Sequence, residues 1–251
     1  MYFFLILLLM NIVSPYHHFL NKVIIKSKHN NKQLICTTPG GYKGFYTLGI
    51  CHFIKDNYNL DNFYFSGASA GAWNSLFFTY NGNNNNFINS VFNLELKDKS
   101  TIYNLQYDLK NVLLNNYKTD DFDFKKLYIA VSTLNRFSLK NVIHNDFYSL
   151  DDAINCCMAS SHIPLITGRL LFKYKNKYTF DGGFKKNPLD DDATLLITAS
   201  MWNSSIIQNS TEFKIVIKNN LKLTMEDLKY LYELGYSDSE FNKHLLDEIL
   251  I

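Results

Sequence analysis

A serine between two glycines is the first group in this chain whose surroundings suggest chemistry. The stretch SGASAG at residues 66–71 places Ser69 between Gly67 and Gly71, directly after the apolar run at residues 63–65. A serine on a sharp turn from a strand into a helix exposes its hydroxyl, and small residues on either side let strand and helix pass closely. The N-terminal amides of that helix favour negative charge near the serine oxygen. The spacing predicts a nucleophile at Ser69, although a tight connection without chemistry has the same pattern.

The glycine-rich stretch PGGYKG at residues 39–44 follows an expected strand at 33–38. Such a loop can present consecutive backbone N–H groups to an anion. Dinucleotide binding would require G-x-G-x-x-G, but Pro39 occupies the first position, and the Gly-Lys-Ser/Thr of a phosphate loop does not follow. An oxyanion hole is the better interpretation. Its donors would be Gly40, Gly41 and Tyr42, because proline has no N–H.

A nucleophilic serine also needs a neighbour that accepts its proton. Among the seven histidines, only His244 follows Asp181, as the Ser-Asp-His order of a conventional hydrolase requires. His244 falls within an expected amphipathic helix, and the spacing of His162 does not select it. Asp181 ends an expected hairpin strand and is followed by Gly182 and Gly183, which would let its carboxylate approach another loop closely. Asp181 is therefore a candidate base that takes the serine proton directly.

The order of the expected elements indicates one α/β domain. Strands at 33–38 and 62–66 alternate with helices at 45–56 and 70–80, which predicts parallel strands joined by crossover helices, with both loops at the same sheet edge. The other expected elements are a helical region at 87–117, strands at 126–134 and 138–144, a helix through 161 capped by Ser149 with Asp152, a hairpin at 170–180, strands at 193–200 and 212–218, and two terminal helices that begin at Thr224 and Ser237 and are separated by a cap at Gly235.

Three motifs together resemble a known family. PGGYKG, GASAG and DGG, in that order, are similar to the signatures of patatin-like acyl hydrolases, and MASSHIPLITG resembles the segment that those proteins carry before Asp-Gly-Gly. The resemblance covers about residues 33–190 and implies a three-layer α/β/α sandwich with a central, mostly parallel sheet. It also implies a Ser-Asp dyad with no metal or organic cofactor. In that dyad Ser69 is the nucleophile, Asp181 is the base, Gly40, Gly41 and Tyr42 line the oxyanion hole, and Lys43, Gly44, Gly67, Gly71, Gly182 and Gly183 complete the motifs.

Pro39 departs from the family pattern, because it replaces the first glycine of the loop. Proline supplies neither an amide donor nor a left-handed conformation, so a catalytically impaired lipid-binding protein is one alternative. Lys43 matches a basic position often found in that loop, which favours a retained structure. A conventional α/β-hydrolase that uses His244 is the other alternative.

The resemblance implies a serine acyl hydrolase that cleaves fatty-acyl esters of lipids, of the phospholipase or lipase type. Because lipids are met at an interface, membrane association is expected. The 25 basic and 23 acidic side chains supply no strong field, so nucleic acid is not expected as a partner. The four cysteines (Cys36, Cys51, Cys156 and Cys157) suit neither a disulfide scaffold nor a zinc site, and they favour a reducing compartment.

The first 20 residues form an apolar segment that opens MYFFLILLLMNIV. Its apolar run is short of the roughly 20 residues that a spanning helix needs, and it lacks the basic region and cleavage site of an ordinary signal peptide. It is interpreted as an anchor, an atypical secretion signal or a first core element. Residues 33–190 are expected to form the catalytic core, and residues 191–251 to complete the same domain.

Overall fold

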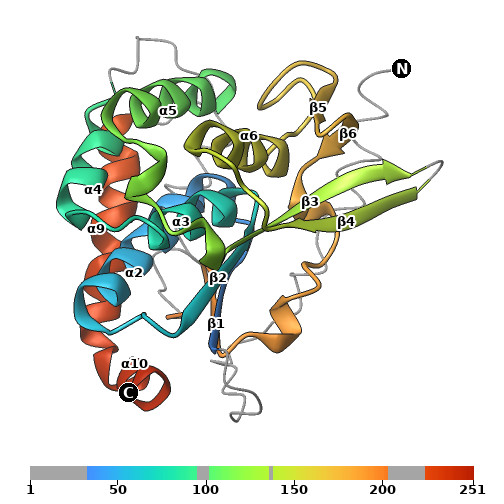
Figure 1. The fold of residues 1–251 in the computed structure, drawn as a ribbon. Coiled ribbons are helices and arrows are strands. Elements are labelled where there is room, and N and C mark those ends of the chain that lie inside the picture. The colour runs from blue at the N-terminus through green and yellow to red at the C-terminus, as the bar shows by residue number, and fades with distance from the viewer. Residues whose placement is uncertain (1–32, 95–101, 136–137, 203–223) are drawn as a thin grey trace.

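The computed structural model describes residues 33–94, 102–135, 138–202 and 224–251, and in these ranges the chain builds one mixed sheet (Figure 1). The strand order is β5-β6-β3-β2-β1-β7, with β4 paired to β3. The strands are β1 (Gln33–Thr37), β2 (Phe63–Ala68), β3 (Leu127–Asn135), β4 (Ser138–His144), β5 (Phe172–Tyr174), β6 (Lys177–Phe180) and β7 (Leu195–Ile197).

The centre of this sheet is parallel. β1 pairs in parallel with β2 and β7, and β2 pairs in parallel with β3, whereas β4, β5 and β6 join by antiparallel pairing. The register places Thr37 of β1 beside Gly67 of β2, so the loops that follow these two strands leave from the same edge. The predicted α/β fold with a central, mostly parallel sheet is confirmed, and this edge is where the glycine loop and the serine turn meet.

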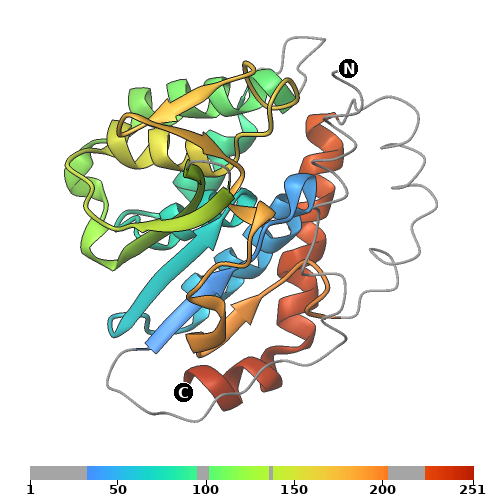
Figure 2. The ribbon, with the colours of Figure 1, turned by 90° about the vertical axis from the view of Figure 1, so that its right-hand side faces the viewer.

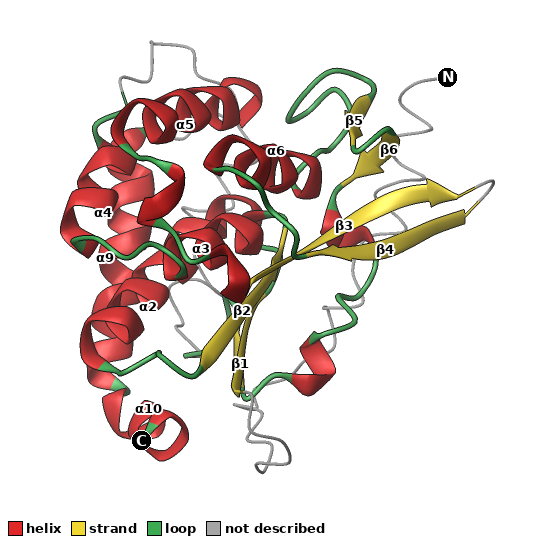
Figure 3. Ribbon diagram, in the orientation of Figure 1, coloured by secondary structure: helices red, strands yellow, loops and turns green. Residues whose placement is uncertain are grey.

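Helices flank the sheet (Figure 3). They are α2 (Gly44–Asn57), α3 (Ala70–Phe78), α4 (Asn84–Phe92), α5 (Ile102–Asn116), α6 (Leu150–Ser160), α9 (Met225–Phe241) and α10 (Lys243–Leu250). α3 packs against β1 and β2, α6 packs against β3, and α9 runs along α2 (Figure 2). Among the described helices, none combines the length and apolarity needed to cross a bilayer.

Most of the expected elements are confirmed with small shifts of their ends. Ser149 accepts a hydrogen bond from the Asp152 N–H at the start of α6, and Thr224 and Asp227 form a reciprocal capping box on α9. The expected strand at 193–200 is shorter, because the Thr198 hydroxyl accepts a hydrogen bond from the backbone of Ser200 and turns the chain. The expected strand at 212–218 and the apolar residues 1–20 lie outside the described residues. The division of the chain at residue 190 stays a prediction.

The predicted helix break at Gly235 is wrong. Gly235 lies inside α9, and the next helix begins at Lys243 rather than at Ser237. A Cβ atom built on Gly235 would lie 2.0 Å from the Tyr46 carbonyl oxygen on α2. The glycine therefore serves close helix packing and not capping, which are two uses that a single sequence position does not distinguish.

Gly49 on α2 makes the matching approach from the other side. A Cβ atom on Gly49 would lie 2.0 Å from the carbonyl oxygen of Tyr232 on α9. The Tyr46 hydroxyl also donates a hydrogen bond of 2.6 Å to Asp238 of α9. The two helices thus meet backbone to backbone, and α2 is held along its length.

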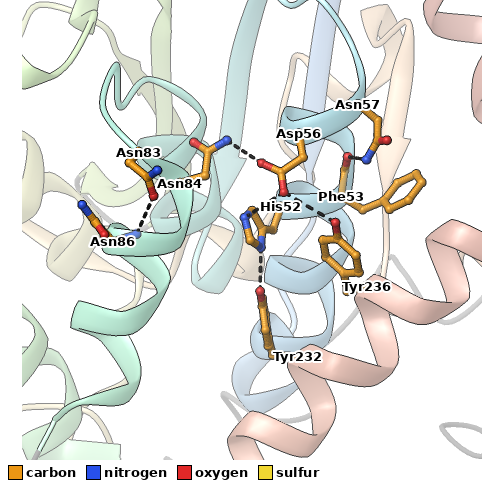
Figure 4. A network of polar contacts seen from close by, with 9 residues as sticks. All are labelled: His52, Phe53, Asp56, Asn57, Asn83, Asn84, Asn86, Tyr232 and Tyr236. Carbon is orange, nitrogen blue, oxygen red and sulfur yellow. Dashed lines mark hydrogen bonds and ion pairs between the residues drawn. The ribbon is translucent and has the colours of Figure 1, made fainter.

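A polar network adds α4 to this pair of helices (Figure 4). Nδ1 of His52 on α2 lies 2.6 Å from the Tyr232 hydroxyl on α9, and Nε2 lies 3.2 Å from Oδ2 of Asp56. Asp56 also accepts hydrogen bonds from Tyr236 of α9 and from Asn84 of α4. Both ring nitrogens of His52 therefore face polar partners between α2 and α9.

Candidate active site

Ser69 stands on a strained turn between β2 and α3. Its backbone angles are φ 55° and ψ −128°, in a region that side-chain-bearing residues rarely adopt. A Cβ atom on Gly67 would lie 2.1 Å from the Gly71 carbonyl oxygen, and one on Gly71 would lie 2.1 Å from the Thr37 carbonyl oxygen. Any side chain at either position would overlap backbone. The two glycines are what allows α3 to start directly against β1 and β2.

The turn brings Ser69 to Asp181. The Ser69 hydroxyl donates a 2.6 Å hydrogen bond to Oδ2 of Asp181, which follows β6. Oδ1 of the same carboxylate accepts a 2.7 Å hydrogen bond from the Gly183 N–H, and the Asp181 N–H donates to the His162 carbonyl oxygen. Both Ser69 and Asp181 are buried. The carboxylate is thus fixed through one oxygen and directed at the serine through the other.

Burial raises the pKa of the Asp181 carboxyl to about 6, although the hydrogen bonds from Ser69 and Gly183 act in the opposite direction. An ordinary aspartate has a pKa of about 3.9 and is a weak base toward an alcohol. Raising the pKa strengthens the base, while a value of about 6 leaves most of the carboxylate ionised at neutral pH. The site therefore holds a carboxylate whose proton affinity is increased by its surroundings.

We expect kcat/KM of the wild-type protein to follow one ionisation with an apparent pKa of about 6. The ionised carboxylate accepts the proton, so activity should be full above pH 7 and should fall about tenfold for each pH unit below 5. The measurement is a pH–rate profile on a water-soluble ester, with circular dichroism at each pH to exclude unfolding. A rate that stays constant from pH 4 to pH 8 would contradict this assignment.

The glycine loop lies beside the serine turn. It forms a short 3-10 turn over Gly41–Lys43, and Gly41 has φ +54°. A Cβ atom on Gly44 would lie 2.5 Å from the Cβ of Ala70, so the loop is packed against the first residue of α3. Gly41 and Tyr42 line the same cavity as Ser69, and the backbone N–H groups of Gly40 and Gly41 donate to no described residue. Gly40 lies outside that cavity lining.

Pro39 is accommodated in this arrangement. The left-handed conformation of the loop falls on Gly41, so residue 39 need not adopt it. A Cβ atom on Gly183 would lie 2.8 Å from both Cβ and Cγ of Pro39. The proline ring therefore packs on the Asp-Gly-Gly turn that carries Asp181. The glycine loop and the Asp-Gly-Gly turn are in direct contact at this point.

Ser160, at the end of α6, is a site residue to which the sequence assigned no role. Its hydroxyl accepts a 2.8 Å hydrogen bond from the Ser69 N–H and donates a 2.7 Å hydrogen bond to the Ala130 carbonyl oxygen of β3. The side chain is fully buried, and a Cβ atom on Gly182 would lie 3.0 Å from its oxygen. Ser160 thus joins the serine turn, the central sheet and the Asp-Gly-Gly turn. The available signal was a pair of serines at the end of an apolar helix.

Ser160→Ala is expected to lower kcat by about 10- to 100-fold with little change in KM, because the Ser69 backbone loses the partner that fixes its position. Unfolding should also become easier by about 1–3 kcal/mol, since two buried backbone groups lose a hydrogen bond. The matched control is Ser239→Ala on α9, whose buried hydroxyl donates to the Gly235 carbonyl oxygen. If both variants lose stability and neither loses kcat, Ser160 has no positioning role.

An apolar cavity opens from the Ser69 and Asp181 side chains and contains about 920 Å³ of empty space, including the part open to solvent. Most of its wall comes from apolar residues of the four helices α2, α3, α4 and α5 and of two loops, namely Phe45, Leu48, Trp73, Phe87, Val91, Leu94, Leu105, Leu109, Leu113 and Ile163. Polar groups in the wall are bonded within the protein. The Gln106 amide donates to the Thr167 carbonyl oxygen, and the Trp73 indole N–H donates to Ser161. The cavity therefore offers an apolar surface that ends at the hydrogen-bonded side chains of Ser69 and Asp181.

Comparison with known proteins places this site in a family. A family model described as "Patatin-like phospholipase" matches residues 39–193, which is more than half of the chain and includes all three motifs. The chain belongs to the patatin-like phospholipase family. No match was found among curated proteins.

Two solved structures are similar to this patatin-like chain. The heterodimeric complex ExoU-SpcU from the type III secretion system of Pseudomonas aeruginosa matches with 10% identity and a TM-score of 0.42, over 89% of this chain and 53% of that chain. VipD from Legionella pneumophila matches with 12% identity and a TM-score of 0.41, over 96% of this chain and 73% of that chain. This chain thus spans about half the length of the ExoU-SpcU chain that it matches.

None of the histidines in the described ranges bonds to Ser69 or Asp181 through its side chain in this patatin-like chain. His244 is exposed on α10, His52 lies between α2 and α9, and the ring of His162 packs against Phe172. No described histidine hydrogen-bonds to Ser69. In the described ranges, no three His, Cys, Asp or Glu residues are grouped so that they could hold a metal ion.

Proposed function

We propose that the protein is a serine hydrolase that cleaves fatty-acyl esters of lipids through a Ser69–Asp181 dyad. The observation that carries this proposal is the 2.6 Å hydrogen bond between Ser69 Oγ and Asp181 Oδ2 at the end of an apolar cavity. A hydroxyl bonded to a carboxylate is a nucleophile with its base in place. The apolar wall suits an acyl chain, whose burial is favourable in proportion to its apolar area.

The proposed reaction has two stages. Ser69 Oγ attacks the ester carbonyl carbon while Asp181 accepts the hydroxyl proton, and the tetrahedral intermediate collapses to an acyl-enzyme as Asp181 returns that proton to the leaving alcohol. Water then attacks the acyl-enzyme with Asp181 again as the base, and the fatty acid is released. The negative oxygen of each intermediate accepts hydrogen bonds from amides of Gly40, Gly41 and Tyr42, each of the order of 3 kcal/mol in such sites.

The backbone supports this electrostatic role. The loop amides and the N-terminus of α3 lie at the same edge of the sheet as the serine. The partial positive charge at the start of the helix therefore adds to that of the loop. Two observations support a functional loop in spite of Pro39. The left-handed conformation falls on Gly41, and the proline ring packs on Gly183 beside Asp181. Under this proposal no metal or cofactor enters the reaction.

The test is acyl release from a panel of phospholipid, lysophospholipid and triacylglycerol esters, together with covalent labelling by a fluorophosphonate probe. We expect labelling at Ser69 and fatty-acid release from at least one lipid class. Labelling without release from any ester would limit the function to lipid binding. Absence of both would refute the hydrolase proposal. The ratio of phospholipid to triacylglycerol rates separates phospholipase from lipase activity.

The proposed place of action is the surface of a membrane that faces a reducing compartment. Lipid esters with long acyl chains are presented at such surfaces. The four cysteines are buried free thiols, and burial raises the pKa of each of them, so they remain protonated. Fractionation of the tagged full chain with membranes, and recovery in a soluble fraction after removal of residues 1–20, would test whether that segment supplies the attachment.

A further inference from the structure

We propose that the loop from α6 to β5 and the β5–β6 hairpin form a surface that docks onto anionic lipid bilayers. This surface, called here the docking face, comprises residues 161–180. The inference rests on the proposed function, because it explains how the cavity reaches a lipid ester. The occupant is a bilayer with negatively charged headgroups.

The docking face carries exposed leucines on a loop whose conformation is fixed. Leu165, Leu170 and Leu171 are 52%, 42% and 54% exposed. Leu165 has φ +64°, and its N–H donates to the Gly168 carbonyl oxygen, which closes the turn. A leucine held in the left-handed region with half of its surface in water adds nothing to the core. The three leucines lie within residues 165–171, and exposed apolar residues that are close together mark interaction sites.

The charge of the docking face suits a bilayer with anionic headgroups. Residues 161–180 contain Arg169, Lys173, Lys175 and Lys177 and no aspartate or glutamate, which gives +4, whereas the whole chain has a net charge of +2. The rest of the chain therefore sums to −2. Lys175 forms an ion pair with Asp146 at 3.0 Å, so three basic side chains of the face are in no ion pair among the described residues. Basic residues beside an apolar cluster attract negatively charged headgroups.

The docking face is continuous with the catalytic cavity. Ile163 and Thr167, on the same loop as the leucines, line the cavity together with Ser69. The Thr167 hydroxyl accepts a hydrogen bond from the Ile163 N–H and donates to the Ser161 carbonyl oxygen, which joins the loop to the end of α6. A bilayer on the leucines would meet the protein beside the cavity, so an acyl chain would pass from membrane to cavity with little exposure to water.

The test measures binding without turnover, in the full chain with Ser69→Ala. Two proteins are compared: this parent, and a leucine variant that also carries Leu165→Ser, Leu170→Ser and Leu171→Ser. Each is sedimented with vesicles of phosphatidylcholine alone and with vesicles that contain 30 mol% phosphatidylglycerol. We expect stronger binding to the anionic vesicles, and at least a tenfold loss of that binding in the leucine variant. The control is Tyr230→Ser with Phe241→Ser, because these side chains are 55% and 84% exposed on α9. That control should bind within about twofold of the parent.

The charge contribution is tested separately with Lys173→Glu and Lys177→Glu. These changes should weaken binding to phosphatidylglycerol vesicles about tenfold or more and leave the weak binding to neutral vesicles unchanged. If the leucine and lysine variants both bind as tightly as the parent, the docking face is wrongly assigned. The same conclusion follows if the lysine variant loses as much binding as the leucine variant on neutral vesicles as well as on anionic ones.

A second measurement separates failure of this inference from failure of the proposed function. Hydrolysis of a soluble short-chain ester and of vesicle lipids is measured with the parent and the leucine variant, both with Ser69 intact. Normal hydrolysis by the leucine variant, with reduced rates on vesicles only, supports both proposals. If both proteins hydrolyse the soluble ester and the leucine changes alter neither binding to vesicles nor the rate on them, only the docking face is overturned. Leucine-dependent vesicle binding by a protein that hydrolyses no ester overturns the hydrolase proposal and leaves the docking face intact.

Discussion

Ser69→Ala is expected to lower kcat for ester hydrolysis by about 10⁴-fold or more, because the variant has no atom that can form the acyl-enzyme. Removal of the hydroxyl leaves the cavity and the loop amides in place, so binding of the substrate should persist. The effect should appear in kcat with KM nearly unchanged. The measurement is steady-state hydrolysis of a soluble ester together with labelling by a fluorophosphonate probe, which should disappear.

The control for this variant is its fold. Alanine differs from serine only in lacking the hydroxyl and has the same Cβ atom at this turn, so the circular dichroism spectrum should be unchanged. Ser75→Ala on α3 is a matched comparison, since Ser75 is also buried and lies outside the cavity lining. Ser75→Ala should retain labelling and most of the rate. Continued labelling of Ser69→Ala would place the nucleophile elsewhere.

Asp181→Asn is expected to reduce kcat by about 10³-fold or more, since an amide of the same shape cannot accept the serine proton. Asparagine keeps an oxygen and can retain the hydrogen bond from the Gly183 N–H, so the turn should persist. The variant should therefore bind substrate and lose turnover. Asp190→Asn, which changes another buried carboxylate outside the cavity lining, is the control and should remain active. Full activity in Asp181→Asn would assign the base to another group.

The same substitution should stabilise the fold at neutral pH. The carboxyl pKa is about 6 in the folded protein against an ordinary value of 3.8, so the protonated form is favoured by folding and the ionised form is disfavoured. The ionised carboxylate therefore lowers the free energy of unfolding. This loss is absent well below pH 3.8, grows between pH 4 and pH 6, and reaches about 3 kcal/mol above that range. Asparagine carries no charge, so Asp181→Asn should unfold at a higher temperature than wild type at pH 8 and at the same temperature near pH 4. Equal stability at both pH values would contradict the raised pKa.

The sequence was informative where a residue type has few physical uses. Glycines on either side of Ser69, and the Asp181 turn after a hairpin, predicted two points of close backbone approach. The structure brings the two turns together, and Ser69 Oγ lies 2.6 Å from Asp181 Oδ2. The order of strands and helices predicted the parallel centre of the sheet, since short crossovers leave few topologies. Capping at Ser149 and Thr224 also followed from local hydrogen bonding alone.

Features that depend on distant partners could not be read in the same way. Gly235 has the spacing of a helix cap, but its role is set by Tyr46, far away along the chain. Ser160 acquires its role from the Ser69 N–H and the Ala130 carbonyl oxygen, which are brought to it only by the folded sheet. The apolar spacing of α4 and α5 predicted helices without indicating that they wall a cavity. Periodicity reports which face is apolar and not what lies against it.

The backbone contact between α2 and α9 makes α9 a support for the loop that carries the proposed oxyanion donors. α2 begins at Gly44, directly after the loop that carries Gly41, and its other side rests on α9 through Gly49 and Gly235. α9 lies beyond residue 193, outside the matched family region, yet it packs against the helix that follows the glycine loop. We expect a chain cut at that boundary to keep every proposed catalytic group and to lose the packing of α9 against α2. Under the proposed mechanism, the smallest active unit is therefore larger than the region that carries the three motifs.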